Sequence, residues 1–473
     1  MGTAGIMTAC SGEVSKESDA IALVGATVID GTGADAIKNA LIIVEGDRIT
    51  CAGDKESCLI PEGAIIIDLT GKYVTPGLVD SHIHFGQTGW LDGRPDGVNV
   101  GGRYPYEDVV ADLRDHPETR YRSYLCSGVT AVYDVGGFPW TIGLKEGAEN
   151  NTAAPHIAAA GPLVSHAGRL IMSAGGESTF IMLTSEDVGI EAVRQIKSWG
   201  ADAVKVWFLA PSEEDRAEID ARFMAVAKEA KAQGINLIVH ATTYREAKIA
   251  VDAGAHMLVH SVTNQPVDDD FITAMKASGT FYAPTLFAGA NWGMAIAAAG
   301  LQFVPIIDDP NGCVDPATRE KLLSAPEQNE YVLFETSQEI FQAGLARNEV
   351  ALQLMNENLK RVHDEGIPVV MATDAGNPMT LHGVSVYAEM EGMQAAGLTP
   401  REVIVAATQT GARVMGREKD FGTLEAGKIA DLIVLSENPL EDVSTFRSIM
   451  QVMRAGKMHD IADLSWNSLD VPD

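Results

Sequence analysis

The two ends of the chain share a pattern of short apolar runs separated by turn signals. From the N-terminus onward, these runs cover residues 21–24, 40–44, 64–67, 430–435 and 449–453. Asp30-Gly31, Glu45-Gly46-Asp47 and Ala455-Gly456-Lys457 interrupt or follow them. Apolar runs of this length bounded by Gly and Asp are typical of β-strands and their turns. The pattern therefore predicts one small β domain that is built from both termini, over residues 21–72 and 417–465.

The middle of the chain, residues 73–416, alternates strand-like and helix-like segments. The strand candidates are 79–85, 131–135, 156–161, 203–207, 236–240, 257–260, 280–284 and 369–374. Amphipathic segments lie between several of them, at 190–199, 217–233 and 244–253. Eight strands with intervening helices predict a parallel α/β barrel. The longest interruption, 289–348, follows the seventh strand, and an insertion of that length is often a lid or a substrate wall.

Polar residues with ligand chemistry stand at the ends of these predicted strands. His82 and His84 end the first strand and, two residues apart, project to the same face of it. Lys205 lies in strand four, and His240, His260 and Asp374 end strands five, six and eight. In an α/β barrel the chemistry sits at the carboxyl ends of the strands. We therefore expect all of these side chains to meet at one metal site.

Imidazole and carboxylate are the ligands that zinc and similar divalent ions prefer. A lysine becomes a ligand only after its amine reacts with carbon dioxide to give an anionic carbamate. The remaining histidines fit no such pattern: His156 begins its strand, at the opposite end of the barrel, and four lie in helix-like or loop segments, namely His116, His256, His363 and His459. If the four histidines at strand ends had only structural roles, each of them would occupy its strand end independently of the others. A shared metal site explains all four positions together, so we favour it.

In their order, these motifs resemble the amidohydrolase superfamily, in the branch of imidazolonepropionase-related and prolidase-like metal-dependent hydrolases. Besides the strands of His240 and His260, the resemblance rests on TPGLVDSHIHF (75–85), GVTAVYDVGG (128–137), GADAVKVW (200–207), ATDAGNPMTLHG (372–383), AATQTGARVMG (406–416) and GTLEAGKIADLIVL (422–435). It implies a distorted (β/α)8 barrel flanked by a β-sandwich. It also implies that His82, His84 and Asp374 bind one metal, that His240 and His260 bind a second, and that carbamylated Lys205 bridges them.

The resemblance implies a hydroxide that bridges two divalent ions. Zinc is the expected metal, with Mn, Co or Fe as alternatives. Asp374 would be the catalytic proton shuttle. The substrate would be a small amide, peptide or urea-type molecule. Related dipeptidases carry a Tyr two positions after the strand-five histidine, where this chain has Thr242. His166, Tyr244 and His382 are candidates for the substrate pocket. A mononuclear cyclic-amide hydrolase or deaminase, and a non-catalytic surface lipoprotein that uses the barrel as a scaffold, stay open as alternatives.

Composition narrows the class of partner. The formal charge is −30 with a pI near 4.6, which argues against nucleic acid and anionic membranes. No apolar run is long enough to cross a bilayer, and a homo-oligomer is left open. The five cysteines show no CxxC spacing, so we expect neither a disulfide framework nor a zinc-thiolate site.

Residues 1–20 are expected to be a disordered leader. Within it, MTACSG at 7–12 is similar to a bacterial lipoprotein cleavage site. Only nine residues precede Cys10 and none is basic, so any signal is truncated. Acylation of Cys10 would place the protein in the cell envelope or periplasm, and otherwise the protein would be cytoplasmic.

Overall fold

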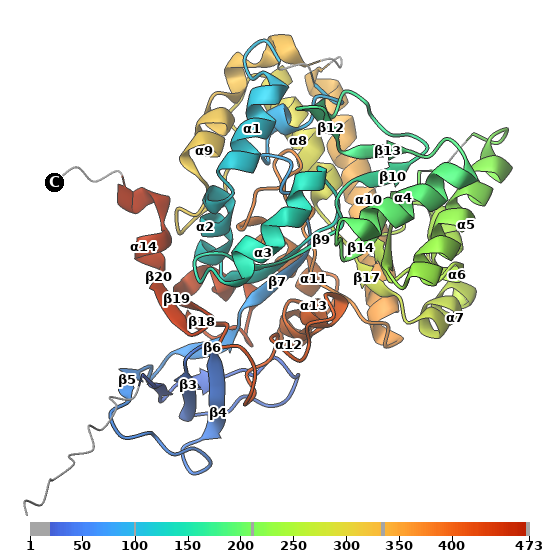
Figure 1. The fold of residues 1–473 in the computed structure, drawn as a ribbon. Coiled ribbons are helices and arrows are strands. Elements are labelled where there is room, and N and C mark those ends of the chain that lie inside the picture. Colours follow the sequence, from blue (N-terminus) through green and yellow to red (C-terminus); the bar gives the residue numbers. More distant parts are fainter. Residues whose placement is uncertain (1–18, 99–100, 210–211, 333–335, 470–473) are drawn as a thin grey trace, which may run out of the picture.

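The computed structural model describes residues 19–98, 101–209, 212–332 and 336–469. Two small sheets lie at the ends of the chain, one of them built from both termini, and Figure 1 shows the blue N-terminal strands beside the red C-terminal ones. One sheet has the order β4-β3-β1-β5, with β1 (Ile21–Val24), β3 (Ala40–Glu45), β4 (Arg48–Asp54) and β5 (Ile65–Asp68). The other has the order β2-β6-β18-β19-β20, with β2 (Thr27–Val28), β6 (Tyr73–Pro76), β18 (Leu432–Leu435), β19 (Ile449–Arg454) and β20 (Lys457–Asp460).

The two small sheets share one hydrophobic core. Leu23 and Ile42 from the first sheet belong to the same buried cluster as Val74, Leu432 and Met453 from the second. The antiparallel pair of β6 with β18 joins the two ends of the chain, with Val74 opposite Val434. Strands from both termini therefore pair and share a core, as expected. The division of the chain into domains stays a prediction.

The middle of the chain supplies parallel strands. β7 (Leu78–Ile83), β8 (Val129–Asp134) and β9 (His156–Ala159) pair in that order. A second sheet has the order β13-β10-β14-β15-β16-β17, with β10 (Leu163–Ser165), β13 (Phe180–Met182), β14 (Ala203–Trp207), β15 (Asn236–His240), β16 (Met257–Val259) and β17 (Phe281–Ala283). Seven of the eight expected strands are therefore present at the expected positions.

The eighth expected strand, 369–374, differs from a regular strand. Its β pairing consists of isolated bridges, between Tyr282 and Val369 on one side and between Ile83 and Ala375 on the other. The Asp374 amide donates to the His82 carbonyl at 2.8 Å, so the segment lies between β17 and β7. On the far side, the Asp202 amide donates to the Ala159 carbonyl at 2.9 Å, which links β9 to the start of β14. These contacts link both edge strands of the three-stranded sheet, β7 and β9, to the six-stranded sheet.

Helices follow the strands and cover them (Figure 1). Those up to the seventh strand are α1 (Tyr106–Asp115), α2 (Glu118–Cys126), α3 (Leu144–Glu149), α4 (Glu186–Ser198), α5 (Arg216–Gln233), α6 (Tyr244–Asp252) and α7 (Asp269–Ser278). The later ones are α8 (Ala288–Gly300), α9 (Pro316–Leu323), α10 (Gln338–Asp364), α11 (Ser385–Ala395), α12 (Pro400–Ala406), α13 (Gln409–Val414) and α14 (Ile461–Leu464). The three predicted amphipathic segments coincide with α4, α5 and α6. Among the described helices, none is both long and apolar enough to span a membrane.

Local sequence explains where these helices begin and end. The Ser185 hydroxyl accepts from the Val188 amide at the start of α4, and the Asp268 carboxylate does the same for Phe271 at the start of α7. α5 ends at Gly234, whose φ of 61° is the left-handed conformation that terminates many helices. The short elements are the hairpin β11 (Ser173–Ala174) and β12 (Glu177–Ser178) and the 3-10 turns η1 (Leu91–Gly93), η2 (Pro139–Gly143), η3 (Ala325–Glu327), η4 (Asn329–Tyr331), η5 (Val443–Ser448) and η6 (Trp466–Leu469).

The expectation that the cysteines form no disulfides is wrong. Cys51 pairs with Cys58 beside β4, and Cys126 of α2 pairs with Cys313 in the long insertion after β17. The sequence hides these pairs because one spans 187 residues and because Cys10 makes the total odd. Cys10 and most of the expected leader lie outside the described residues.

Candidate active site

The six predicted ligands meet at the carboxyl ends of the parallel strands. They come from five separate segments: β7, β14, β15, β16 and the segment before Ala375. All of them line one cavity of about 550 Å³, namely His82, His84, Lys205, His240, His260 and Asp374. Convergence from such distant parts of the sequence follows from the parallel arrangement, because every strand ends at the same edge.

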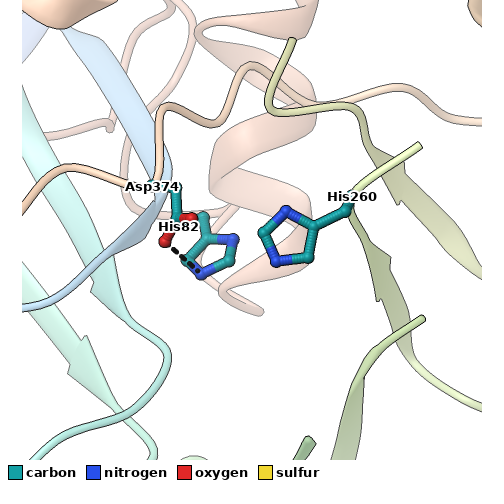
Figure 2. A group of neighbouring side chains, drawn as sticks. All are labelled: His82, His260 and Asp374. Atoms are coloured by element: carbon teal, nitrogen blue, oxygen red, sulfur yellow. Dashed lines mark ion pairs between the residues drawn. The ribbon is translucent and has the colours of Figure 1, made fainter. Parts of the chain in front are cut away.

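Side chains in this group are close enough to share a cation. The Nε2 atoms of His82 and His84 lie 3.2 Å apart, and Oδ1 of Asp374 lies 3.1 Å from the first and 2.9 Å from the second. The rings of His240 and His260 have centroids 4.4 Å apart, and the centroids of His82 and His260 are separated by 5.2 Å. Figure 2 shows the His260 imidazole facing the pair formed by His82 and Asp374.

Two of these residues have unusual backbone conformations. His260 has a φ of 74° and Asp374 a φ of 67°, and Thr285, which contacts His260, has a φ of 45°. A residue other than glycine in this left-handed region of φ costs of order 1–3 kcal/mol of conformational energy. Such residues are found mainly at functional sites. At the ends of β16 and of the 369–374 segment, the positive φ turns these two side chains toward the cavity.

Buried hydrogen bonds orient the imidazoles. Nδ1 of His84 lies 2.5 Å from the Gly136 carbonyl, and Nδ1 of His260 lies 2.6 Å from the Thr285 hydroxyl. In metal sites the second ring nitrogen is held in this way, which leaves Nε2 free for the ion. Below them, the buried Asp80 carboxylate accepts from the Thr373 hydroxyl at 2.6 Å and from the His82 amide at 3.3 Å. These contacts fix the strand ends that carry the ligands.

Burial sets the protonation states. It lowers the pKa of His82 and His240 well below the usual value for imidazole, and lowers that of His260 to about 4. Burial also lowers the pKa of Lys205 to about 7, although Asp374 and Asp134 oppose this shift. Burial alone would raise the pKa of Asp374, but His82 and His84 hold it well below its usual range. The site therefore combines neutral nitrogen donors with an anionic oxygen donor.

This donor set fits a divalent cation. His82, His260 and Asp374 each offer one ligand atom, and these atoms all lie within 4.8 Å of one another. Nitrogen and carboxylate donors suit zinc and other first-row ions. Ligands must be deprotonated to bind, and the shifted pKa values provide that state near neutral pH.

The rest of the cavity is mostly apolar. Its described lining includes Leu163, Met172, Phe180, Trp207, Leu286, Phe287, Leu352 and Met355. Leu286 and Phe287 directly precede α8, and Leu352 and Met355 lie on α10, so the segments that flank the 289–348 insertion supply much of one wall. A smaller polar part of the lining contains Gln87, Arg94 and Asn377. Gln87 and Arg94 carried no recognisable signal in the sequence, because they stand in loops without strand or helix periodicity. Asn377 lies within the 372–383 motif, but nothing in that motif singled it out as a cavity residue.

The three residues predicted for the substrate pocket are absent from the described lining of the cavity. The hydroxyl of Tyr244 donates to the Asp268 carboxylate at 2.7 Å. His382 is buried between the Tyr124 hydroxyl at 2.7 Å and the Gln87 carbonyl at 2.9 Å, behind the lining. The chain turns after β10, and Met172 rather than His166 lines the cavity. A role of these three residues in substrate binding stays a prediction.

The histidines that the sequence placed away from strand ends have hydrogen-bond partners outside the cavity. Nε2 of His156, at the start of β9, lies 2.9 Å from Asp431, and Nδ1 lies 2.9 Å from Glu149. His256 contacts the Val414 carbonyl and His459 the Thr152 carbonyl, each at 2.8 Å. Strand-end position thus separated the histidines that meet in the cavity from those that do not.

Comparison with curated proteins yields relatives with named activities. A 5-methylthioadenosine/S-adenosylhomocysteine deaminase of Symbiobacterium thermophilum is 24% identical over 450 residues, which cover 88% of this chain and 85% of the relative. An imidazolonepropionase of Thermoplasma acidophilum is 33% identical over 93 residues. That match covers 20% of this chain and only 22% of the relative's length.

Solved structures share the fold at low sequence identity. Molinate hydrolase superposes with a TM-score of 0.70 at 20% identity, covering 97% of this chain and 98% of that one. A Xaa-Pro dipeptidase with bound methionine in its active site gives 0.67 at 23% identity, covering 93% and 100%. The amidohydrolase family model matches residues 73–459, which include every ligand described above. Since this match extends over most of the sequence, the chain belongs to the amidohydrolase family.

Proposed function

We propose that this chain is a binuclear, metal-dependent hydrolase that cleaves a C–N bond of an amide, peptide or urea type. The observation that carries the proposal is the buried Lys205 beside four imidazoles and one carboxylate in a single cavity. Lys205 is 1% exposed, and a lysine is rarely buried without a partner. Its pKa of about 7 leaves much of the amine neutral at neutral pH, as reaction with carbon dioxide requires.

Each ligand has a proposed role. His82, His84 and Asp374 would hold one ion, His240 and His260 a second, and the Lys205 carbamate would bridge them. When bound, the ions supply an acidified water and polarise the substrate carbonyl. Asp374 accepts a proton from the attacking water and delivers it to the leaving nitrogen, because an amine is a poor leaving group without protonation.

The same proposal covers the architecture. The parallel strands would form a distorted (β/α)8 barrel over residues 73–416, and the two small sheets a β-sandwich over 21–72 and 417–465. The links from 369–375 to β17 and β7, and from Ala159 to Asp202, support closure of the barrel. The core shared by the two small sheets supports the sandwich.

The cavity walls favour a substrate with a bulky apolar group. The ring centroids of Phe180 and Trp207 lie 5.4 Å apart, and Leu286, Phe287 and Met355 add apolar surface to the same cavity. Thr242 lines the cavity at the position where related dipeptidases have a tyrosine. We therefore place amides with aryl or large aliphatic substituents ahead of dipeptides.

One observation favours a second candidate, a mononuclear cyclic-amide hydrolase or deaminase. His82, His260 and Asp374 offer three ligand atoms within 4.8 Å of one another, a set that suits a single ion. One of the long curated matches is named a deaminase. Lys205 argues for two ions, because a single-ion site has no need of a bridging lysine.

Metal analysis of the purified protein, combined with a hydrolysis screen, tests the proposal. We expect about two divalent ions per chain, and hydrolysis of an aryl amide, an N-acyl amino acid or a dipeptide that a chelator abolishes and added zinc restores. One ion with full activity would favour the mononuclear candidate. No ion and no hydrolysis would favour the non-catalytic scaffold. Lys248→Met is a control for Lys205→Ala, because Lys248 lies outside the described cavity lining and forms an ion pair with Asp252 on α6.

We also propose that the protein works in an oxidising compartment, which favours the cell envelope or periplasm over the cytoplasm. Disulfides persist in such compartments and are rare in the reducing cytosol, and two pairs are present here. Alkylation of the protein before and after reduction counts its free thiols. We expect four additional thiols after reduction, and none would refute this assignment.

A further inference from the structure

A chain of polar contacts links the cavity wall to Asp374. Nδ2 of Asn377 donates to Oδ1 of Asp374 at 2.8 Å and to its carbonyl at 3.2 Å. On the other side of the same amide, Oδ1 of Asn377 accepts a hydrogen bond from Arg94. We propose that Arg94 and Asn377 are positioning residues that hold the Asp374 carboxylate in its working orientation. This inference rests on the proposed function, in which Asp374 is both ligand and proton shuttle.

The chemistry of the neighbours fixes which way the amide points. A guanidinium has donors only, and a carboxylate has acceptors only. The Asn377 oxygen must therefore face Arg94, and its NH2 group must face Asp374. No other orientation satisfies both neighbours, so Arg94 determines where the Asn377 donor is placed.

Arg94 is itself held on three sides. Its Nε and Nη2 atoms donate to the two carboxylate oxygens of Asp96, at 2.8 Å and 2.9 Å. Its guanidinium stacks on Trp292 of α8, 4.5 Å from the ring centroid. A Cβ on Gly97 would lie 2.4 Å from that ring, so the loop and α8 are in close contact. A bidentate, stacked guanidinium has a fixed plane, which a lysine cannot reproduce.

The loop that carries Asn377 is packed closely against the end of β7. The Gly89 amide donates to the Gly376 carbonyl at 2.8 Å, and the Met379 amide donates to the Gly89 carbonyl at 2.8 Å. Gly376 has a φ of 107°, and a Cβ there would lie 2.5 Å from the His84 carbonyl oxygen. Only glycine permits this approach, and it brings Asn377 within reach of Asp374.

The contacts of Asp374 explain what this arrangement would do. The hydrogen bond from Asn377 and the contacts with His82 and His84 all fall on one oxygen of this carboxylate, Oδ1. A carboxylate anchored through one oxygen keeps the other oxygen and the plane of the group in a defined direction. A ligand and proton shuttle needs that definition, because misplacement by a fraction of an ångström slows proton transfer.

Arg94 also lines the cavity, so the competing explanation is direct contact with a negatively charged substrate. Zinc affinity measured without substrate separates the two roles, because a substrate contact leaves it unchanged. The variants are Asn377→Ala, Arg94→Lys and the double variant. Arg103→Lys is the matched control, because Arg103 pairs with the exposed Glu327 outside the described lining.

The experiment strips the full-length protein with a chelator, titrates it with zinc against a chromogenic chelator, and then measures kcat and KM on one neutral and one carboxylate-bearing aryl amide. We expect both single variants to lose roughly 10–100-fold in zinc affinity or kcat, as is usual when a residue that supports a metal ligand is removed. KM should change less than kcat, and by the same factor for both substrates. The double variant should lose no more than Asn377→Ala, since both residues act through one contact.

Other results would overturn the inference. These are unchanged zinc affinity with a KM that rises only for the carboxylate-bearing substrate, additive losses in the double variant, or wild-type values in both single variants. Arg94→Lys keeps the charge and tests the same contact if Asn377→Ala fails to fold. A wild-type protein that neither binds zinc nor hydrolyses any amide would refute the proposed function itself, which distinguishes that failure from the others.

Discussion

Removal of the disulfide between Cys126 and Cys313 should be the most destabilising change outside the cavity. The bond joins α2 to the insertion that carries α9, across 187 residues. Both sulfurs are fully buried, so alanine is the appropriate replacement because it adds no polar group. The disulfide between Cys51 and Cys58 spans only 7 residues and provides an internal control.

Loop closure gives the expected magnitudes. A crosslink removes entropy from the unfolded chain in proportion to the logarithm of the loop length, which corresponds to about 5 kcal/mol for the long loop and about 2 kcal/mol for the short one. The unfolding entropy of a chain of 473 residues is about 1 kcal/mol per kelvin. Cys126→Ala with Cys313→Ala should therefore lower Tm by about 5 °C, and Cys51→Ala with Cys58→Ala by about 2 °C.

Scanning calorimetry on the two double variants and the wild type measures these shifts, and thiol counting under denaturing conditions confirms which bond is missing. If the long-loop variant melts within 1 °C of wild type, or above the short-loop variant, the loop-closure reasoning fails. If the long-loop variant loses activity at temperatures well below its Tm, the disulfide also keeps the insertion in place locally. The insertion contains most of α8, which lines the cavity.

Three further predictions concern the site and its support. Lys205→Ala should lower metal content from about two ions per chain toward one or none, and metal analysis that still finds two would remove the carbamate. Asp374→Asn, measured with saturating zinc, should lose at least about 100-fold in kcat, so an undiminished kcat would refute the proton shuttle. Burial disfavours the charged form of His156, but Asp431 and Glu149 outweigh it and raise its pKa above the unfolded value. Its stabilisation is therefore complete below about pH 6.5 and lost as the pH rises through the folded value, and His156→Gln should flatten that decline in urea unfolding between pH 6 and 9.

Strand ends were the part of the site that sequence could predict. His82, His240 and His260 each follow an apolar run of the length of one strand, and parallel strands end at one edge. Asp374 was found on the same grounds, although its segment is held only by isolated bridges. The prediction survived that irregularity because position along the chain, not regular pairing, brings the carboxylate to the edge.

Loop residues and distant pairs were outside the reach of sequence reasoning. Arg94 and Asn377 lie in loops, where no periodicity tells which side chain points inward. His382 was predicted for the pocket because it follows strand eight, but the backbone turn beginning at Gly376 carries it behind the lining. The pairing of Cys126 with Cys313 depends on the three-dimensional path of the insertion, which local pattern does not encode.

The positions of backbone strain support the same location for the chemistry. Within the described residues, seven non-glycine residues have positive φ, and His260, Thr285 and Asp374 are three of them. All three line one cavity, although Thr285 and Asp374 are 89 positions apart in the sequence. Strain of this kind is unfavourable for folding and persists where the surrounding packing determines the conformation. Here that packing includes the bridge between Ile83 and Ala375 and the hydrogen bond between Nδ1 of His260 and the Thr285 hydroxyl. The fold therefore tolerates unfavourable backbone conformations at the two strand ends whose side chains face each other across the cavity, as expected if their common purpose is to hold an ion.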